Sequence, residues 1–159
     1  HRVRRDSGRL SKRFFDRALA SGIAVEQYVE AVGIVTFLAG VDHFCLSLGI
    51  DAFPLPEPEP GEATRQRPEG VTDGIAWVPM LLPEDARGPE ADLYPVPEAP
   101  NIARALSLVP DHARMLQVMS AAHYLAIEDI PNPTLARDLD RLQIELVAAR
   151  VSAMNECFY

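Results

Sequence analysis

The sequence predicts an all-α protein whose helical clusters are joined by a proline-rich connector. Apolar residues recur every three or four positions in several separate stretches, which is the spacing of one face of a helix. No stretch shows the alternation of apolar and polar residues that is typical of a half-buried strand. Most of the 14 prolines lie between residues 53 and 100, where their missing amide donors disfavour helices and central strands.

Two helices are predicted in the N-terminal third. Residues 10–22 form a short amphipathic pattern that Gly22 ends. Residues 25–48 form a longer pattern, with Gly49 just past its end. Gly33 and Gly40 lie seven positions apart on nearly the same face of this helix, which favours the close approach of a neighbouring helix.

The connector has two parts. Residues 53–70 are predicted to be an extended linker because of their prolines. Residues 71–100 also contain prolines, but they carry an apolar cluster that a solvated linker would lack. We therefore expect this second part to lie ordered across a helical surface, with Trp77 as its anchor.

Three helices are predicted after the connector. A short one begins at Asn101 and ends before Pro110, and a second runs over residues 111–124 with Asp111 as its N-cap. Its expected buried face consists of Met115, Val118, Met119 and Ala122. The last helix is predicted to start near Thr134 or Leu135. It would turn inward Leu139, Leu142, Leu146, Ala149 and Ala153.

Composition and charge narrow the class of protein. The chain has 159 residues, is 48% hydrophobic and has a net charge of −8, which suits a soluble protein with one core or two partial cores. An acidic chain lacks the basic surface that a sequence-independent grip on nucleic acid requires. The basic residues near the N-terminus are predicted to form a solvated arm or exposed helix face, with a patch for an anionic partner as the alternative. They are Arg2, Arg4, Arg5, Arg9, Lys12 and Arg13.

Localisation is predicted from the cysteines and the apolar runs. The two cysteines lie far apart, and no secretory h-region follows the N-terminal arginines, so we expect a reducing cytoplasm. The longest apolar run, residues 31–41, has about half of the roughly 20 residues that a membrane span needs. It predicts a buried helix and no membrane partner. Because the chain begins with His1 instead of Met, we expect a fragment of a longer translation product.

The string ELVAARVSAMNECFY at residues 145–159 holds the two candidate catalytic residues, Glu145 and Cys157. The twelve positions between them correspond to about 18 Å of straight helix, so a contact requires the chain to turn back before Cys157. Asn155 and Glu156 suit such a turn, which would place Cys157 in the first turn of a new helix. Free backbone amides at that position lower the pKa of a thiol and favour the reactive thiolate.

This string resembles the redox motif of the alkylhydroperoxidase-D-like and carboxymuconolactone-decarboxylase-like superfamily. In that motif a Glu is followed, after eleven residues, by Cys-x-x-Cys and then by x-x-x-His. Glu145 and Cys157 occupy the positions of the Glu and the first Cys, Phe158 and Tyr159 occupy the two x positions, and the second Cys and the His would follow. The resemblance implies that Cys157 belongs to a redox pair that reduces a peroxide, and that Glu145 relays protons. An incomplete gene, proteolysis or a selenocysteine codon read as a stop would each end the chain here.

Two longer stretches extend the resemblance. Residues 101–125 are similar to the helices that precede the motif in the superfamily, and residues 10–50 are similar to those that follow it. This inverted order implies a fragment of a two-copy member. Residues 1–52 would be the C-terminal helices of a first copy, residues 53–100 the connector, and residues 101–159 the N-terminal helices of a second copy.

The resemblance implies a thiol-dependent peroxidase or disulfide oxidoreductase with an antioxidant role and no cofactor. Its partners would be a peroxide substrate and a dithiol reductant, such as a lipoyl group on another protein. Exposed apolar helix faces favour a homo-oligomer. With one thiol of the pair, the fragment alone is expected to turn over peroxide poorly. A non-catalytic helical oligomerisation module and a lyase of the carboxymuconolactone decarboxylase branch are the alternatives.

Both candidate catalytic residues have a structural interpretation as well. Glu145 follows Arg141 by four positions, which is the spacing of an ion pair on a helix surface. A lone cysteine such as Cys157 is often a small buried residue.

The remaining histidines and the second cysteine are expected to be structural. Asp42, His43 and Cys45 are too close in sequence to converge on one ion from a helix, so helix packing is favoured over a metal site. His123 is expected to pack or lie at an interface, and His112 to be exposed. No spacing in the chain supports a structural zinc site.

Overall fold

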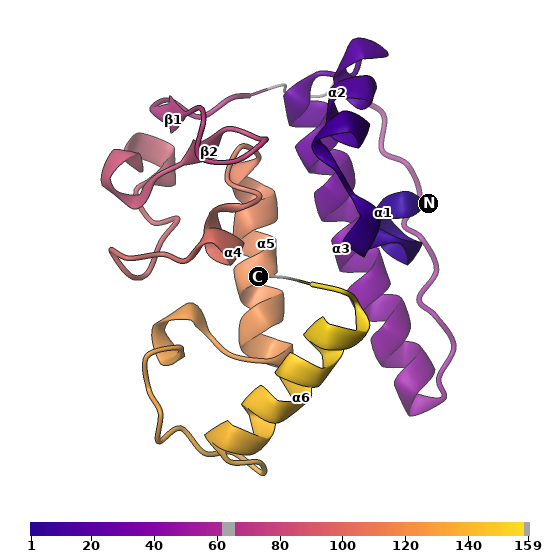
Figure 1. Cartoon of the computed structure of the whole chain (residues 1–159), viewed down its shortest axis with the longest axis vertical. Coiled ribbons are helices and arrows are strands. Elements are labelled where there is room, and N and C mark those ends of the chain that lie inside the picture. Colours follow the sequence, from indigo (N-terminus) through magenta and orange to yellow (C-terminus); the bar gives the residue numbers. More distant parts are fainter. Residues whose placement is uncertain (62–65, 158–159) are drawn as a thin grey trace.

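The computed structural model describes residues 1–61 and 66–157, and this part of the chain is mostly α-helical. Figure 1 shows two long helices side by side, with the connector folded over one end and the last helix at the other. The α-helices are α1 (Arg2–Arg5), α2 (Lys12–Ala20), α3 (Val25–Leu48), α4 (Asn101–Arg104), α5 (Pro110–His123) and α6 (Arg141–Met154). Short 3-10 turns are η1 (Ser7–Arg9), η2 (Pro83–Asp85), η3 (Gly88–Glu90) and η4 (Ile127–Asp129).

The N-terminal helices follow the sequence pattern. The α3 helix has the predicted bounds, and it ends because Gly49 adopts a left-handed conformation with φ of 68°. The α2 helix is shorter than predicted because Ser11 caps it, accepting a hydrogen bond from the Phe14 amide at 3.3 Å. The six basic residues of the N-terminal cluster are exposed, as expected.

Gly33 and Gly40 of α3 permit the close approach of a neighbouring helix, as predicted, and that helix is α5. A Cβ on Gly33 would lie 2.3 Å from Nδ1 of His112, and one on Gly40 would lie 3.0 Å from Cε of Met119. The prediction that His112 is exposed is wrong. Its ring fills the space over Gly33 and meets Phe37 edge to face, with the ring centroids 5.4 Å apart.

The main core joins α3, the second half of the connector and α5. It contains Val29, Phe37, Leu81, Leu93, Leu106, Leu108 and Ala113. The core therefore takes residues from both sides of the connector, and residues 71–100 lie ordered against helices as predicted. The predicted anchor is wrong, because Trp77 is 47% exposed whereas Leu81 and Leu93 are fully buried.

A small hairpin explains why leucine replaces tryptophan as the anchor. Strands β1 (Val71–Thr72) and β2 (Met80–Leu81) pair antiparallel, with Val71 opposite Leu81, and Trp77 lies in the loop between them. The Leu81 amide donates to the Ser107 hydroxyl at 2.8 Å, and the Tyr94 hydroxyl donates to the Leu81 carbonyl at 2.7 Å. Strands of two residues are too short to produce an alternating pattern, so the sequence did not predict them.

The predicted buried face of α5 is partly wrong. Val118 is 69% exposed, and Met115 and Ala122 are also exposed. Only Met119 of the predicted set packs against the core, and Ala113 and Leu116 complete the contact face. The helix begins one residue earlier than predicted, at Pro110, because proline is well accommodated at the first helical position. Asp111 is therefore not the N-cap.

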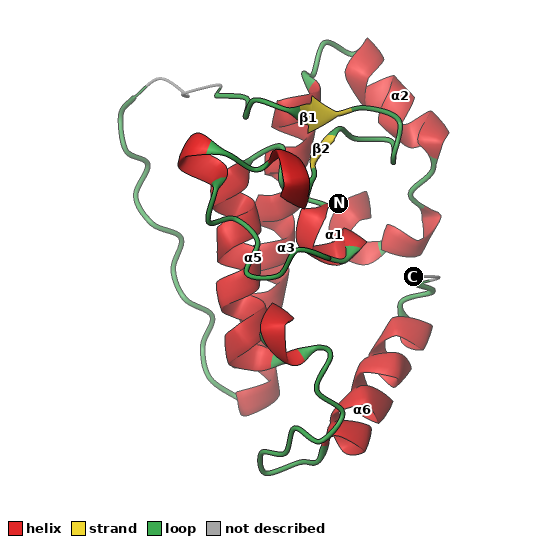
Figure 2. Cartoon of the chain, turned by 90° about the vertical axis from the view of Figure 1, so that its left-hand side faces the viewer, coloured by secondary structure: helices red, strands yellow, loops and turns green. Residues whose placement is uncertain are grey.

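The last helix differs most from its prediction. It begins at Arg141 and not near Thr134, because Asp140 forms a capping box with Gln143. No residue of α6 is buried, so the apolar residues predicted to face inward face solvent, among them Leu142 and Leu146. Figure 2 shows α6 standing apart from α3 and α5.

The α3 helix is long and apolar enough to cross a membrane, with a mean hydropathy of 1.7 over its most apolar window. Core helices of soluble proteins meet the same criterion. Only 17% of that window is buried, so the prediction of a buried helix holds for the face toward α5 and not for the whole helix.

Candidate functional site

The carboxylate of Glu145 is the most extensively bonded predicted site residue. The Tyr124 hydroxyl lies 2.9 Å from Oε1 and 3.0 Å from Oε2, and Arg141 donates from Nε to Oε1 at 2.7 Å. The Glu145 side chain remains 41% exposed. It therefore combines a fixed position with access to solvent, which a proton relay requires.

Local structure brings these three groups together. The capping box at Asp140 sets the start of α6, and the four-residue spacing then places Arg141 beside Glu145 on the helix surface. Arg141 is held in turn by η4 and the loop after it, because Nη1 donates to the carbonyls of Asp129 and Asn132 at 3.1 and 3.3 Å. Tyr124 comes from the end of α5.

Electrostatics keep the Tyr124 hydroxyl in its donor form. Burial raises the pKa of Tyr124, and the hydrogen bond to Glu145 and the charge of that carboxylate raise it further. The nearby Arg141 guanidinium lowers the pKa of Tyr124 by a smaller effect. The phenol is therefore neutral well above physiological pH and continues to donate to Glu145.

An open, largely apolar cavity of about 300 Å³ lies beside this cluster, between the end of α5 and α6. Its walls include the Tyr124 ring and the apolar side chains of Ile144 and Val147. His123, Arg137 and Asp138 supply polar groups at its edge. A small molecule with an apolar part could occupy this cavity next to Tyr124, which bonds to Glu145.

Cys157 lies beyond the opposite end of α6 and is exposed. Glu156 adopts a left-handed conformation with φ of 54°, and the amides of Glu156 and Cys157 bond to the carbonyls of Ala153 and Ser152 at 3.2 and 3.0 Å. These bonds form a Schellman motif that closes α6. The predicted turn at Asn155 and Glu156 is therefore present, but the Cys157 amide belongs to the carboxyl end of α6, where the helix dipole does not favour a thiolate.

The structure does not bring Glu145 and Cys157 together. The helical residues from Glu145 to Met154 alone separate the two by about 14 Å along α6. The prediction that Cys157 opens a new helix also involves Phe158 and Tyr159, which lie outside the described residues.

The other candidate residues have structural roles. Cys45 is buried, and Asp42 accepts a hydrogen bond from Arg4 at 2.7 Å, so this stretch of α3 is used for packing and an ion pair. His123 meets the Phe44 ring edge to face, with centroids 5.0 Å apart. No group of three metal-ligating side chains with suitable geometry occurs among residues 1–61 and 66–157.

Tyr124 was missed by the sequence interpretation. It lies 21 positions before Glu145 and meets it only because the chain reverses through η4 and the following loop.

Comparisons with protein-family models, curated proteins and solved structures find no match for this chain.

Proposed function

We propose that this chain is part of a thiol-dependent peroxidase or disulfide oxidoreductase, with Cys157 as the reacting thiol and Glu145 as the proton relay. The observation that carries the proposal is the Glu145 carboxylate, which Tyr124 and Arg141 hold in place. Tyr124 also lines a cavity. The exposed thiol of Cys157 twelve positions later, as in the motif that the string resembles, supports it.

The proposed reaction begins when the Cys157 thiolate attacks the terminal oxygen of a hydroperoxide. An S–O bond forms and the O–O bond breaks, so the sulfur is oxidised to a sulfenic acid and the peroxide is reduced. The departing alkoxide takes a proton, which Glu145 would relay, and leaves as an alcohol. A dithiol reductant then attacks the sulfenic sulfur and releases water, and its second thiol displaces Cys157 from the mixed disulfide.

The test is to trap the sulfenic acid. One equivalent of cumene hydroperoxide with dimedone should give an adduct at Cys157, detected by mass spectrometry. The adduct should disappear in Cys157→Ser and persist in Cys45→Ser, because Cys45 is buried. Glu145→Gln should slow adduct formation by at least about tenfold, the lower range of general acid–base effects. An adduct that survives Cys157→Ser would refute the assignment.

A second experiment asks where Glu145 meets Cys157. The two lie at opposite ends of α6, so the proposal has them meet either within one chain after a rearrangement or between two copies. When the Glu145→Gln and Cys157→Ser variants are mixed, no single chain carries both Glu145 and Cys157. Recovery of about a quarter or more of the wild-type oxidation rate would place the site between copies, and no recovery would place it within one chain.

A self-associating helical module is the second candidate function, with a second copy of this chain as the partner. The exposed apolar residues of α6 favour it, and they include Leu142, Leu146, Val147, Val151 and Met154. Leu146→Glu should shift the molecular mass in light scattering toward the monomer. Leu55→Glu is a matched control, because Leu55 and Leu146 are both 72% exposed and Leu55 lies in the linker. A monomeric wild-type protein would refute this candidate.

A further inference from the structure

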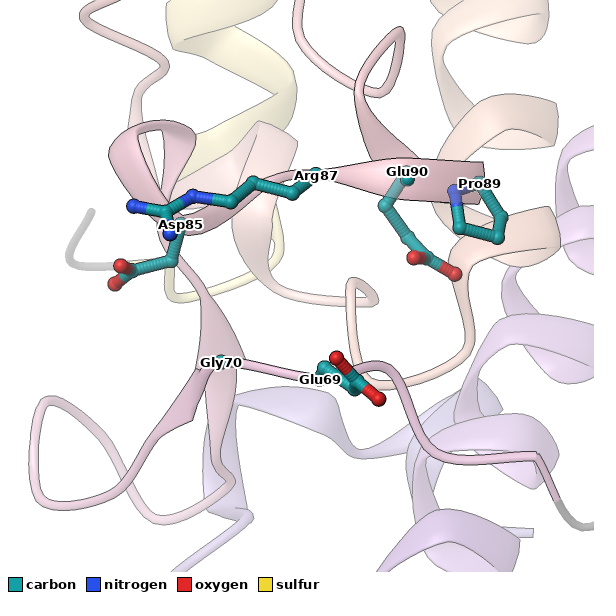
Figure 3. A pocket seen from close by; sticks show the side chains of 7 residues that line it. Glu69, Gly70, Asp85, Arg87, Pro89 and Glu90 are labelled. Carbon is teal, nitrogen blue, oxygen red and sulfur yellow. The ribbon is translucent and has the colours of Figure 1, made fainter.

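A second pocket lies at the far end of the molecule from α6, where the connector folds over the helices. Its volume is about 310 Å³. The walls are the segment that enters β1 and the two 3-10 turns η2 and η3 (Figure 3). The lining residues are Glu69, Gly70, Asp85, Arg87, Gly88, Pro89 and Glu90.

Glu90 is the unusual member of this lining. It is only 7% exposed, yet the described residues supply no hydrogen bond or ion pair to its carboxylate. In Figure 3 the Glu90 side chain extends from η3 toward Glu69 across the pocket. No carboxylate oxygen of Glu90 is among the fully buried polar atoms that lack a partner, so the carboxylate keeps a small contact with water, which a cation in the pocket could replace.

Three arginines that lie in, precede or contact the segments lining the pocket do not pair with Glu90. Arg114 reaches the Pro89 carbonyl at 2.6 Å, but its guanidinium is shared with Asp92 at 2.9 Å and Asp111 at 3.1 Å. Arg67 pairs with Glu26 at 2.8 Å. The Arg87 side chain is exposed and extends away from Glu90 in Figure 3.

The pocket is shaped by backbone and therefore exists without a ligand. Gly70 and Gly88 have φ of 76° and 59°, values that residues other than glycine rarely adopt. A Cβ on Gly70 would lie 3.2 Å from the Cβ of Asp85, so the entry to β1 packs tightly on η2. Preformed walls lower the entropic cost of binding.

We propose that this pocket binds a small organic cation through an ammonium or guanidinium group, with Glu90 as the buried counter-charge. Glu69 and Asp85 add negative potential at the exposed side of the pocket. A metal ion is disfavoured, because the carboxylates of the described residues do not form a set of three that could ligate one ion. The volume lies at the lower end of the range for small-molecule pockets.

The test is calorimetric titration of the chain with agmatine, which carries both an ammonium and a guanidinium group. We expect saturable binding that weakens at least tenfold in Glu90→Gln and is unchanged in Glu98→Gln, whose position is exposed outside the pocket. Magnesium chloride at matched ionic strength should not compete. No saturable binding, equal binding by Glu90→Gln, or displacement of agmatine by magnesium would each overturn the proposal.

A second measurement separates loss of the site from loss of the fold. Glu90→Gln removes the charge while keeping the shape of the side chain, and no described residue pairs with that charge, so the free variant should unfold within a few degrees of the wild-type temperature. A much lower unfolding temperature would mean that Glu90 supports the fold through a partner of its own, and would overturn its role as a ligand.

Discussion

Three tyrosines of this structure are partly buried. The pKa values of Tyr28, Tyr94 and Tyr124 are all raised, and burial is the largest cause at each. Tyr94 donates to the carbonyl of the fully buried Leu81, and Tyr124 donates to Glu145. Both bonds require the protonated phenol, so ionisation would remove a donor from the core and another from the candidate site.

The protein should therefore lose stability at alkaline pH. A tyrosine whose pKa is raised by folding contributes its full stability below its unfolded pKa of about 10, and loses it as pH rises through the folded value. We expect the free energy of unfolding in urea to fall between pH 9 and pH 11, and to fall less in Tyr94→Phe. An equal fall in that variant would show that Tyr94 titrates normally.

At the scale of elements, two glycines set the distance between α3 and α5. The close approach at both glycines can be predicted from the sequence, because small residues seven positions apart share a face of a helix and permit another helix to come close. Which side chain fills each space is a tertiary property: an imidazole packs over Gly33 and a flexible methionine end over Gly40. The two positions should therefore respond differently to the same substitution.

Gly33→Ala should destabilise the protein by about 1–3 kcal/mol, the usual cost of overpacking, because the His112 ring is rigid and close. Gly40→Ala should lie within about 1 kcal/mol of the wild type, since the end of Met119 can move and alanine gains helix propensity. Urea unfolding of both variants checks the difference. Equal losses would contradict a rigid contact at His112.

A chemically marked helix end was predicted correctly in one helix and wrongly in another. Gly49 marks the end of α3, and that helix has the predicted bounds. The start of α6 carries an equally clear mark, Asp140 with Gln143 three positions later, but apolar residues before it extended the predicted helix too far. Periodicity alone cannot locate a boundary when the preceding loop also carries apolar residues at helical spacing.

For the whole molecule, the second half of the connector, residues 71–100, is part of the core and not a tether. Its two fully buried leucines, Leu81 and Leu93, touch helices that lie before and after it in sequence. The sequence shows that residues 71–100 need a surface to cover, but not which side chain is buried. That choice depends on the hairpin register, which places Trp77 in a loop. The contact between Tyr124 and Glu145 also depends on the path of the chain.

Shortening a buried side chain of the connector should therefore destabilise the whole protein. Leu93→Ala should cost about 2–5 kcal/mol, as expected for a fully buried leucine, and Trp77→Ala should cost less than about 1 kcal/mol despite its larger side chain. Chemical denaturation followed by circular dichroism measures both. A larger loss for Trp77→Ala would restore it as the anchor.

The position of Trp77 also determines what optical spectroscopy can report. It is the single tryptophan of the chain, and it lies half-exposed in a hairpin loop. Its emission is expected to be solvent-relaxed in the folded protein, so unfolding should change the fluorescence spectrum little. The same indole lies in the loop between β1 and β2, and Val71 of β1 directly follows Gly70, which lines the pocket proposed to bind a cation. Tryptophan fluorescence is therefore a local probe of that hairpin and a poor measure of global stability.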